Sequence, residues 1–184
     1  MKVLHVIKGI KTVYILTKSK LMSKGNIGIK GRVSCDNGVK FDSRINSFIE
    51  LDGKISIKRN CEFRAFNGGN LIIHSGCSFN NNCFIASASK IEIQEGTIFA
   101  PNVVVVDHDH DYKDPNGLKA LSYKTGNIYI GKNVWIGANV VILRNTIIGD
   151  NCVIGAGSIV SGTVEENTVL VQKREQEYRK FQRI

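Results

Sequence analysis

The chain has 184 residues, of which 42% are hydrophobic, and a formal net charge of +9 at pH 7. This length and hydrophobic content can build one compact domain with a buried core. The sequence contains no apolar stretch long enough to cross a membrane as a helix.

The positive charge is concentrated in residues 1–40. Eight Lys and Arg residues precede the first acid, Asp36, which leaves a net charge of only +1 for the rest of the chain. Aliphatic residues are interleaved with these bases, so the segment suits an amphipathic helix that either lies on an anionic membrane or covers the first turn of a solenoid. We slightly favour a cap that hides an open sheet edge. Nucleic-acid binding is not expected, because the bases lack interleaved aromatic residues and a recognised module.

The chain start has no secretory apolar region followed by a small-residue cleavage site. We therefore expect a cytoplasmic protein, and a membrane-bound helix would place it at the inner face of the membrane. The five cysteines include no CxxC pair, which argues against a zinc ribbon. Four of them fall on inward positions of the repeat described below and are interpreted as reduced core residues, namely Cys61, Cys77, Cys83 and Cys152. Cys35 has no assigned role.

Aliphatic residues recur at intervals of six in the C-terminal half: Ile130, Ile136, Ile142, Ile148, Ile154 and Val160. Glycine follows four of them, and a small or β-branched residue stands four positions after each: Val134, Val140, Thr146, Cys152, Ser158 and Val164. A period of six fits neither a helix nor a strand, whose periods are 3.6 and 2. It indicates that three six-residue units close one triangular turn of a parallel β-solenoid. The corner residues Asn133, Asn139, Asn145 and Asn151 are expected to supply left-handed backbone conformations.

The same spacing continues upstream in weaker form, so we predict a solenoid over 41–170 and a capping segment with helix-forming composition over 171–184. The spacing lapses between Val105 and Ile130. Residues 106–127 are polar and contain Pro115 and Gly117, which predicts a long loop extruded from one corner. Functional residues often lie on such loops because a rigid scaffold positions them.

The runs that begin at Ile130 and Ile148 closely resemble those of the hexapeptide-repeat acyltransferases. The nearest branch contains galactoside and maltose O-acetyltransferases and the O-acetyltransferases of bacterial capsule, exopolysaccharide and lipopolysaccharide synthesis. The resemblance implies a left-handed parallel β-helix, a homotrimer with active sites between subunits, acetyl-CoA as the acetyl donor and a sugar or glycan hydroxyl as the acceptor.

A family histidine lies in the loop that leaves the solenoid, and counting from Val105 it matches His110, with His108 as the second choice. A neutral imidazole can withdraw the proton from a sugar hydroxyl near pH 7. Asp107, Asp109 or Asp111 could orient the ring, and Asp107 is also a candidate acceptor contact. An exposed pair of loop histidines is the simpler alternative.

Two further residues match acceptor-side positions of the family. Asn80 matches a sugar-binding asparagine, although a corner Asn that stabilises a turn is nearly as good an interpretation. Trp135, the single Trp of the chain, matches a position that lines the catalytic groove. An acidic acceptor contact of the family falls on Ala88 and is therefore missing, which indicates a different acceptor.

The resemblance also implies donor contacts along the regular coils. The family lysine expected at the CoA phosphates falls on Gly162, so Lys173 or Arg174 would have to replace it. The remaining donor contacts map to small residues that also suit the fold: Gly137, Ala138, Gly155, Ala156 and Ser161.

Two other functions fit the sequence less well. One is a non-catalytic trimeric β-helix that serves as an interaction scaffold, which would not need the histidines of the loop. The other is a metal-dependent hydratase in which His74 of a neighbouring subunit completes a site with His108 and His110. The histidine spacing of such hydratases is absent, so no metal is expected.

Overall fold

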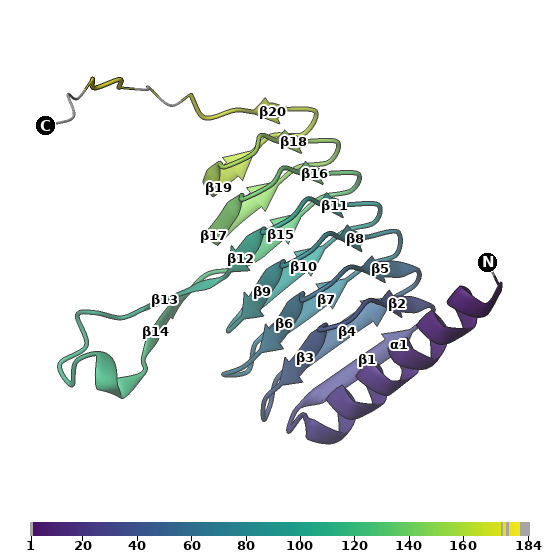
Figure 1. The fold of residues 1–184 in the computed structure, drawn as a ribbon. Coiled ribbons are helices and arrows are strands. Elements are labelled where there is room, and N and C mark those ends of the chain that lie inside the picture. The colour runs from purple at the N-terminus through teal and green to yellow at the C-terminus, as the bar shows by residue number, and fades with distance from the viewer. Residues whose placement is uncertain (1, 174, 176, 181–184) are drawn as a thin grey trace, which may run out of the picture.

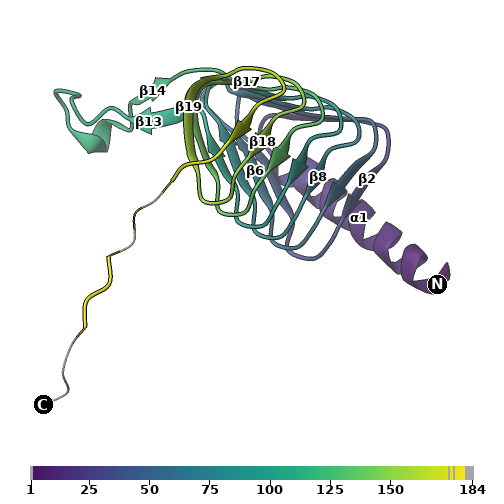
Figure 2. The ribbon, with the colours of Figure 1, turned by 90° about the horizontal axis from the view of Figure 1, so that it is seen from above.

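The computed structural model describes residues 2–173, 175 and 177–180. The chain winds into a parallel β-solenoid in which each coil contributes a short strand to each of three faces (Figure 1). Seen from above, the coils superimpose on one another (Figure 2). The predicted all-β parallel solenoid is therefore confirmed.

The first face consists of β1 (Asn26–Lys30), β4 (Phe48–Asp52), β7 (Asn70–Ile73), β10 (Lys90–Ile93) and β15 (Ile128–Ile130). The second face consists of β3 (Lys40–Ser43), β6 (Glu62–Ala65), β9 (Phe84–Ser87) and β12 (Val104–Val106). The third face consists of β2 (Val33–Cys35), β5 (Ile55–Ile57), β8 (Ser78–Phe79), β11 (Ile98–Phe99), β16 (Trp135–Ile136), β18 (Val153–Ile154) and β20 (Val169–Leu170). Two longer strands, β17 (Val141–Ile148) and β19 (Ile159–Val164), run through the corner between the second and first faces and belong to both.

The interior of the coils is built from the residues of the six-residue repeat. Five of the six aliphatic positions are 0% exposed, and Val160 is 2% exposed. The small residues four positions later are buried as well, from Val134 to Val164. Burial of each aliphatic side chain stabilises the fold by roughly 1.5–3 kcal/mol. Because the strands of successive coils pair in parallel, Ile130 is paired with Ile148, Ile136 with Ile154 and Ile142 with Val160.

Asparagine residues hold the corners, as predicted. Asn133, Asn139, Asn145 and Asn151 have φ angles of 54°, 57°, 59° and 57°. Their side chains also form ladders between coils, in which the Asn102 amide donates to Asn139 at 3.1 Å and the Asn151 amide donates to Asn167 at 3.2 Å. The corner Asn therefore tolerates the left-handed backbone and also joins neighbouring coils.

The upstream coils are longer than the hexapeptide coils. Phe48 pairs with Asn70 and Asn70 with Lys90, whereas Ile128 pairs with Thr146, so one coil takes up more of the chain upstream than it does after residue 127. The first strands begin at Asn26, so the solenoid includes residues that the sequence analysis assigned to the lead-in. The additional residues lie in longer corners, and for this reason the six-residue spacing is less regular in the upstream coils.

All five cysteines are reduced and buried in the interior. Cys61, Cys77, Cys83 and Cys152 occupy the inward positions predicted for them, and Cys35 is buried too. Burial raises the pKa of the Cys77 thiol to about 12. These residues therefore act as small apolar side chains of the core.

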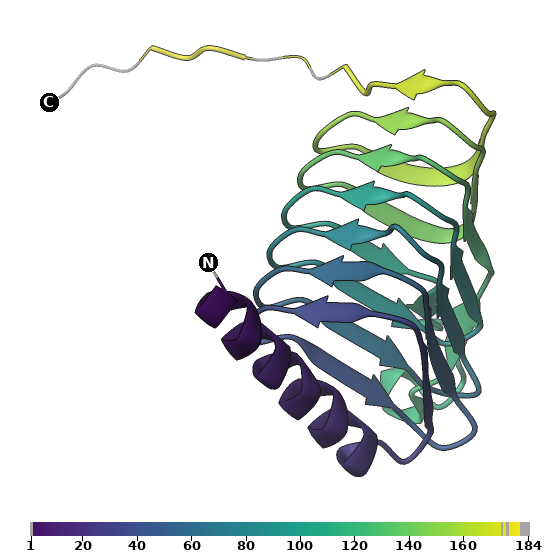
Figure 3. The ribbon, with the colours of Figure 1, turned by 90° about the vertical axis from the view of Figure 1, so that its right-hand side faces the viewer.

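The N-terminal segment forms one helix, α1 (Lys2–Met22), which lies across the open end of the solenoid (Figure 3). The Thr12 hydroxyl accepts a hydrogen bond from the Cys35 backbone N–H at 3.0 Å, and the Ser23 hydroxyl accepts one from Ser43 at 3.1 Å. Ile15 and Leu16 pack against the hydrophobic core. The helix thus acts as a cap, because it covers the edge of the sheets that would otherwise be open.

The opposite end is covered differently. The Gln172 side-chain amide donates to the Ile159 carbonyl at 2.7 Å and accepts from the Ile159 N–H at 3.0 Å, so it occupies the place of one more strand on β19. The other described residues after Leu170 take up neither helix nor strand and leave the coils (Figure 1). The helix expected from their composition does not form in this described part. In the described residues, no helix is long and apolar enough to cross a membrane.

Candidate active site

The predicted loop is a β-hairpin arm, formed by residues 107–127, that leaves the corner between the second and first faces (Figures 1 and 2). Its strands are β13 (His108–His110) and β14 (Tyr123–Thr125), and a short 3-10 helix, Leu118–Ala120, lies near its tip. His108 is paired with Thr125 and His110 with Tyr123. The Gly126 N–H donates to the Asp107 carbonyl at 2.9 Å, which closes the base of the arm. The hairpin holds both histidines in an ordered strand.

Asp107 is 0% exposed and anchors this base. Its carboxylate accepts hydrogen bonds from the Ser87 hydroxyl at 2.8 Å, the Ala88 N–H at 2.7 Å and the Ser89 N–H at 2.9 Å. Its fourth partner is Nδ1 of His108, at 3.2 Å. A buried carboxylate needs such donors to compensate for its lost hydration. Asp107 is therefore a fixed anion beside an imidazole.

The Asp107 carboxylate also determines which nitrogen of His108 carries the proton. An ionised carboxylate only accepts hydrogen bonds, so Nδ1 of neutral His108 is protonated and Nε2 keeps its lone pair. The ring is packed edge-on against Phe66 and Tyr123, with ring centroids 4.9 Å and 5.3 Å away. Its side chain is 15% exposed. His108 is thus an oriented imidazole whose side chain is mostly buried.

His110 has a different environment. It is exposed, and its ring tilts over Tyr123 at a centroid distance of 4.8 Å. No hydrogen bond from a described residue orients the ring, and the two acids on either side of it in the sequence are engaged elsewhere. Asp109 accepts from Arg144 at 2.6 Å, and Asp111 pairs with Lys124 at 3.1 Å. Of the three acids considered as orienting groups, Asp107 is the one that contacts a histidine.

The expected acceptor residues lie elsewhere in the same chain. Trp135 belongs to β16 on the third face and is 56% exposed, between Ile98 and Val153 of the adjacent coils. Asn80 follows β8 of that face, and its side-chain oxygen accepts from the Asn81 N–H at 2.8 Å. The third face lies opposite the corner that carries the arm (Figure 2). One chain does not bring Trp135 or Asn80 to His108.

The expected donor residues divide between two edges of the second face. Gly137–Ala138 and Gly155–Ala156 follow β16 and β18, where the chain turns from the third face to the second. A Cβ atom on Gly137 would lie 2.6 Å from the Ala156 backbone nitrogen, so the stacking of coils already requires this glycine. Ser161 lies in β19 at the other edge. Lys173 is exposed, and Arg174 lies outside the described residues.

Within one chain, His74 does not lie beside the arm histidines. It directly follows β7 of the first face, and Nε2 of its ring is 3.2 Å from the Glu92 carboxylate. Within the part of the chain that the structure describes, no group of three or more His, Cys, Asp and Glu residues is arranged to hold a metal ion.

Residues 127–162 match the family model described as bacterial transferase hexapeptide (six repeats). This segment therefore carries the hexapeptide repeat. The match covers the coils that follow the arm, where the six-residue spacing is most regular. No curated protein matches the chain by sequence.

Solved structures share the hexapeptide-repeat fold. A hexapeptide-repeat acetyltransferase from Vibrio cholerae has 22% identity and a TM-score of 0.54, over 84% of this chain and 72% of that chain. An N-acyltransferase variant from Bacillus cereus, solved with dTDP and coenzyme A, has 18% identity and a TM-score of 0.51, over 89% of each chain. The alignment with the Vibrio cholerae protein in its acetyl-CoA complex has 26% identity and a TM-score of 0.47 and spans 53% of this chain and 54% of that chain, about half of each.

Several residues around His108 could not be found from the sequence. Phe66 and Tyr123 form the walls, and Ser87 together with the Ala88 and Ser89 backbone holds Asp107. Ala88 stands where the resembling family has an acidic acceptor contact. Its side chain cannot replace that acid, but its backbone N–H donates a hydrogen bond to Asp107. The sequence offered one signal for these contacts, namely the stacking of successive coils. Ser87 ends β9 and Asp107 directly follows β12, and these two strands are neighbours in the sheet.

Proposed function

We propose that the protein is an acetyltransferase that moves an acetyl group from acetyl-CoA to a hydroxyl of a sugar. The acceptor we favour is a glycan of bacterial surface polysaccharide, or its precursor, as in capsule, exopolysaccharide or lipopolysaccharide synthesis. The observation that carries the proposal is the Asp107–His108 pair, a buried carboxylate that fixes an imidazole on an ordered arm. The Bacillus cereus structure, which shares this fold and was solved with coenzyme A, supports the choice of donor.

The proposed reaction begins at Nε2 of His108. This nitrogen takes the proton of the acceptor hydroxyl while the hydroxyl oxygen attacks the thioester carbonyl carbon of acetyl-CoA. Asp107 stabilises the imidazolium that forms, because its negative charge lies 3.2 Å from Nδ1. The tetrahedral intermediate then expels the thiolate of coenzyme A, which receives the proton from His108. The O-acetylated sugar and coenzyme A leave, and His108 is neutral again.

His108 takes the role of base in this proposal, although the family resemblance ranked His110 first. His110 remains the alternative base, two residues further along the same strand. The reason for the choice is orientation: Asp107 sets the tautomer of His108, whereas no hydrogen bond from a described residue orients the exposed ring of His110, which tilts over Tyr123.

We further propose a homotrimer with shared active sites. The arm extends from the corner opposite Trp135, so a neighbouring copy is needed to place Trp135 and Asn80 beside His108. The donor would lie along the second face, where Gly137, Ala138, Gly155 and Ala156 let a pantetheine chain approach the backbone, with Ser161 at the far edge. Lys173 or Arg174 would meet the phosphates of coenzyme A.

The direct test is the release of coenzyme A thiol from acetyl-CoA in the presence of a panel of sugars and glycans. We expect acceptor-dependent release by the wild-type protein. An intact trimer that shows no release with any acceptor would favour the scaffold alternative instead.

Subunit complementation tests the shared site. His108→Ala and Trp135→Ala proteins should each be weakly active as homotrimers, and co-expression of the two should restore activity, because some sites then combine an intact His108 with an intact Trp135 from another chain. Co-expressed proteins no more active than the separate variants would contradict a site between subunits.

A further inference from the structure

The outer face of α1 carries an apolar row that no part of the described chain covers. Thr12 and Ser19 face the solenoid and are buried. Ile10, Tyr14 and Leu21 are 66%, 64% and 82% exposed. At 3.6 residues per turn, intervals of four and seven residues place these three side chains in one row, roughly opposite Thr12 and Ser19. Tyr14, at the edge of this row, also lines the groove between α1 and β3. Figure 3 shows that one side of α1 lies against the solenoid and that the opposite side is turned away from it.

Lysines flank this row on both sides. The same helical geometry puts Lys11 and Lys18 on one flank and Lys20 on the other. The α1 segment contains no acid, and Lys11 and Lys20 form no ion pair with a described residue. Lys18 lies 6.0 Å from the centre of the Tyr14 ring. An apolar row with cations along both edges is the pattern of a helix that lies in a membrane interface.

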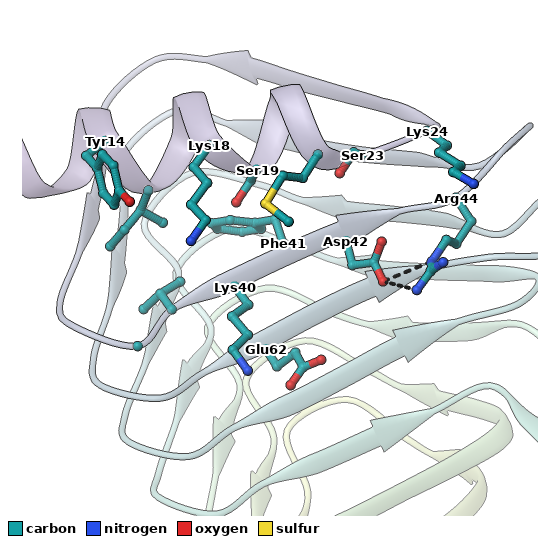
Figure 4. Close-up of a pocket in the computed structure, with 14 residues that line it drawn as sticks. Tyr14, Lys18, Ser19, Ser23, Lys24, Lys40, Phe41, Asp42, Arg44 and Glu62 are labelled. Carbon is teal, nitrogen blue, oxygen red and sulfur yellow. Dashed lines mark hydrogen bonds and ion pairs between the residues drawn. The ribbon is translucent and has the colours of Figure 1, made fainter.

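The solenoid extends the positive charge beyond the helix. A groove of about 640 Å³ separates α1 from β3, with Phe41 in its lining and Lys18, Lys24 and Lys40 around it (Figure 4). The two acids of this groove, Asp42 and Glu62, are paired with Arg44 and Arg64.

A second groove of about 590 Å³ on the other flank is lined in part by Arg32 and Lys54. Both grooves therefore present cations beside the apolar row.

We propose that α1 docks this end of the solenoid on the surface of an anionic phospholipid bilayer. Ile10, Tyr14 and Leu21 enter the headgroup region, and the lysines on the two flanks contact lipid phosphates. A second copy of the chain is a poorer occupant, because pairing two such helices would bring their lysines together with no acid on either helix to compensate. This docking does not depend on the acetyl transfer proposed above, since none of its residues belongs to the proposed active site.

Vesicle sedimentation with the full chain tests the proposal. We expect the wild-type protein to bind vesicles of phosphatidylcholine mixed with phosphatidylglycerol, to bind pure phosphatidylcholine vesicles much less, and to be released by salt. Lys11→Gln and Lys20→Gln should each lower the partition coefficient about fivefold. Tyr14→Glu and Leu21→Glu should lower it by at least about tenfold, because each removes an apolar insertion and adds a charge that the anionic surface repels.

Matched controls come from the arm. Leu118 is 60% exposed and Lys119 is exposed, so Leu118→Glu and Lys119→Gln change the same chemistry away from α1 and should leave the partition coefficient unchanged. Equal binding to neutral and anionic vesicles, or full binding by Leu21→Glu, would overturn the proposal. So would a loss of self-association by Leu21→Glu in light scattering without any vesicle binding by the wild-type protein, because a second copy would then cover the row.

Discussion

Replacing Asp107 with Asn isolates the contribution of one buried carboxylate. Oδ1 of Asp107 accepts from the Ala88 N–H and from Nδ1 of His108, and Oδ2 accepts from the Ser87 hydroxyl and the Ser89 N–H. An Asn amide supplies one oxygen and one NH₂ group, so two of these four donors face another donor. The Ser87 hydroxyl can rotate and accept instead, but a backbone N–H cannot. Either orientation of the amide leaves one backbone N–H without an acceptor.

The magnitude follows from this count. One buried donor without a partner costs about 1–3 kcal/mol of unfolding free energy, and in a chain of this size each kcal/mol lowers Tm by about 2–4 °C. We therefore expect Asp107→Asn to lower Tm by about 2–12 °C. The turnover number should fall by about 10²- to 10⁴-fold in the thiol-release assay, because the imidazolium loses its counter-charge and one amide orientation reverses the tautomer of His108.

Asp109→Asn is the matched control, since it makes the same chemical change on the same arm, in an exposed pair with Arg144. It should change the free energy of unfolding by no more than about 1 kcal/mol. Thermal unfolding followed by circular dichroism and the thiol-release assay measure both effects. An Asp107→Asn protein with the Tm and turnover of the wild type would refute the role assigned to the carboxylate.

Three further predictions concern the base and the core. His108→Ala should lower kcat by about 10²- to 10⁴-fold with the affinity for acetyl-CoA unchanged, and His110→Ala should cost clearly less; the reverse order of kcat values would move the base to His110. Ile148→Asp should unfold several coils together, since the charge would be buried without a partner between stacked aliphatic residues, and a soluble, fully active variant would contradict this. Cys77 should resist thiol reagents at pH 8 in the native protein, because with a pKa of about 12 it stays protonated there, and labelling as fast as in the unfolded protein would be inconsistent with its burial.

Much of the solenoid could be predicted because its repeat is local. Each coil from Ile130 onward repeats the same kinds of interior residue. The packing of these coils can therefore be predicted from an aliphatic residue every six positions and an Asn at the corners, without information from the rest of the chain. The upstream coils are longer, as the pairing of Phe48 with Asn70 shows, and they break this rule. The strands that begin at Asn26 and Val33 therefore could not be recognised in a segment whose composition suggested a basic lead-in.

The sequence by itself determined the parallel solenoid, the corner residues, four of the five interior cysteines and the position of the arm, because each of these depends on residues close together in the chain. Only the tertiary structure decided which histidine is oriented. Asp107 meets Ser87, Ala88 and Ser89 because β12 stacks on β9, the strand of the preceding coil, and Phe66 reaches His108 from a coil further down. His108 and His110 are close neighbours on one strand and chemically identical, so only contacts made between coils can distinguish them.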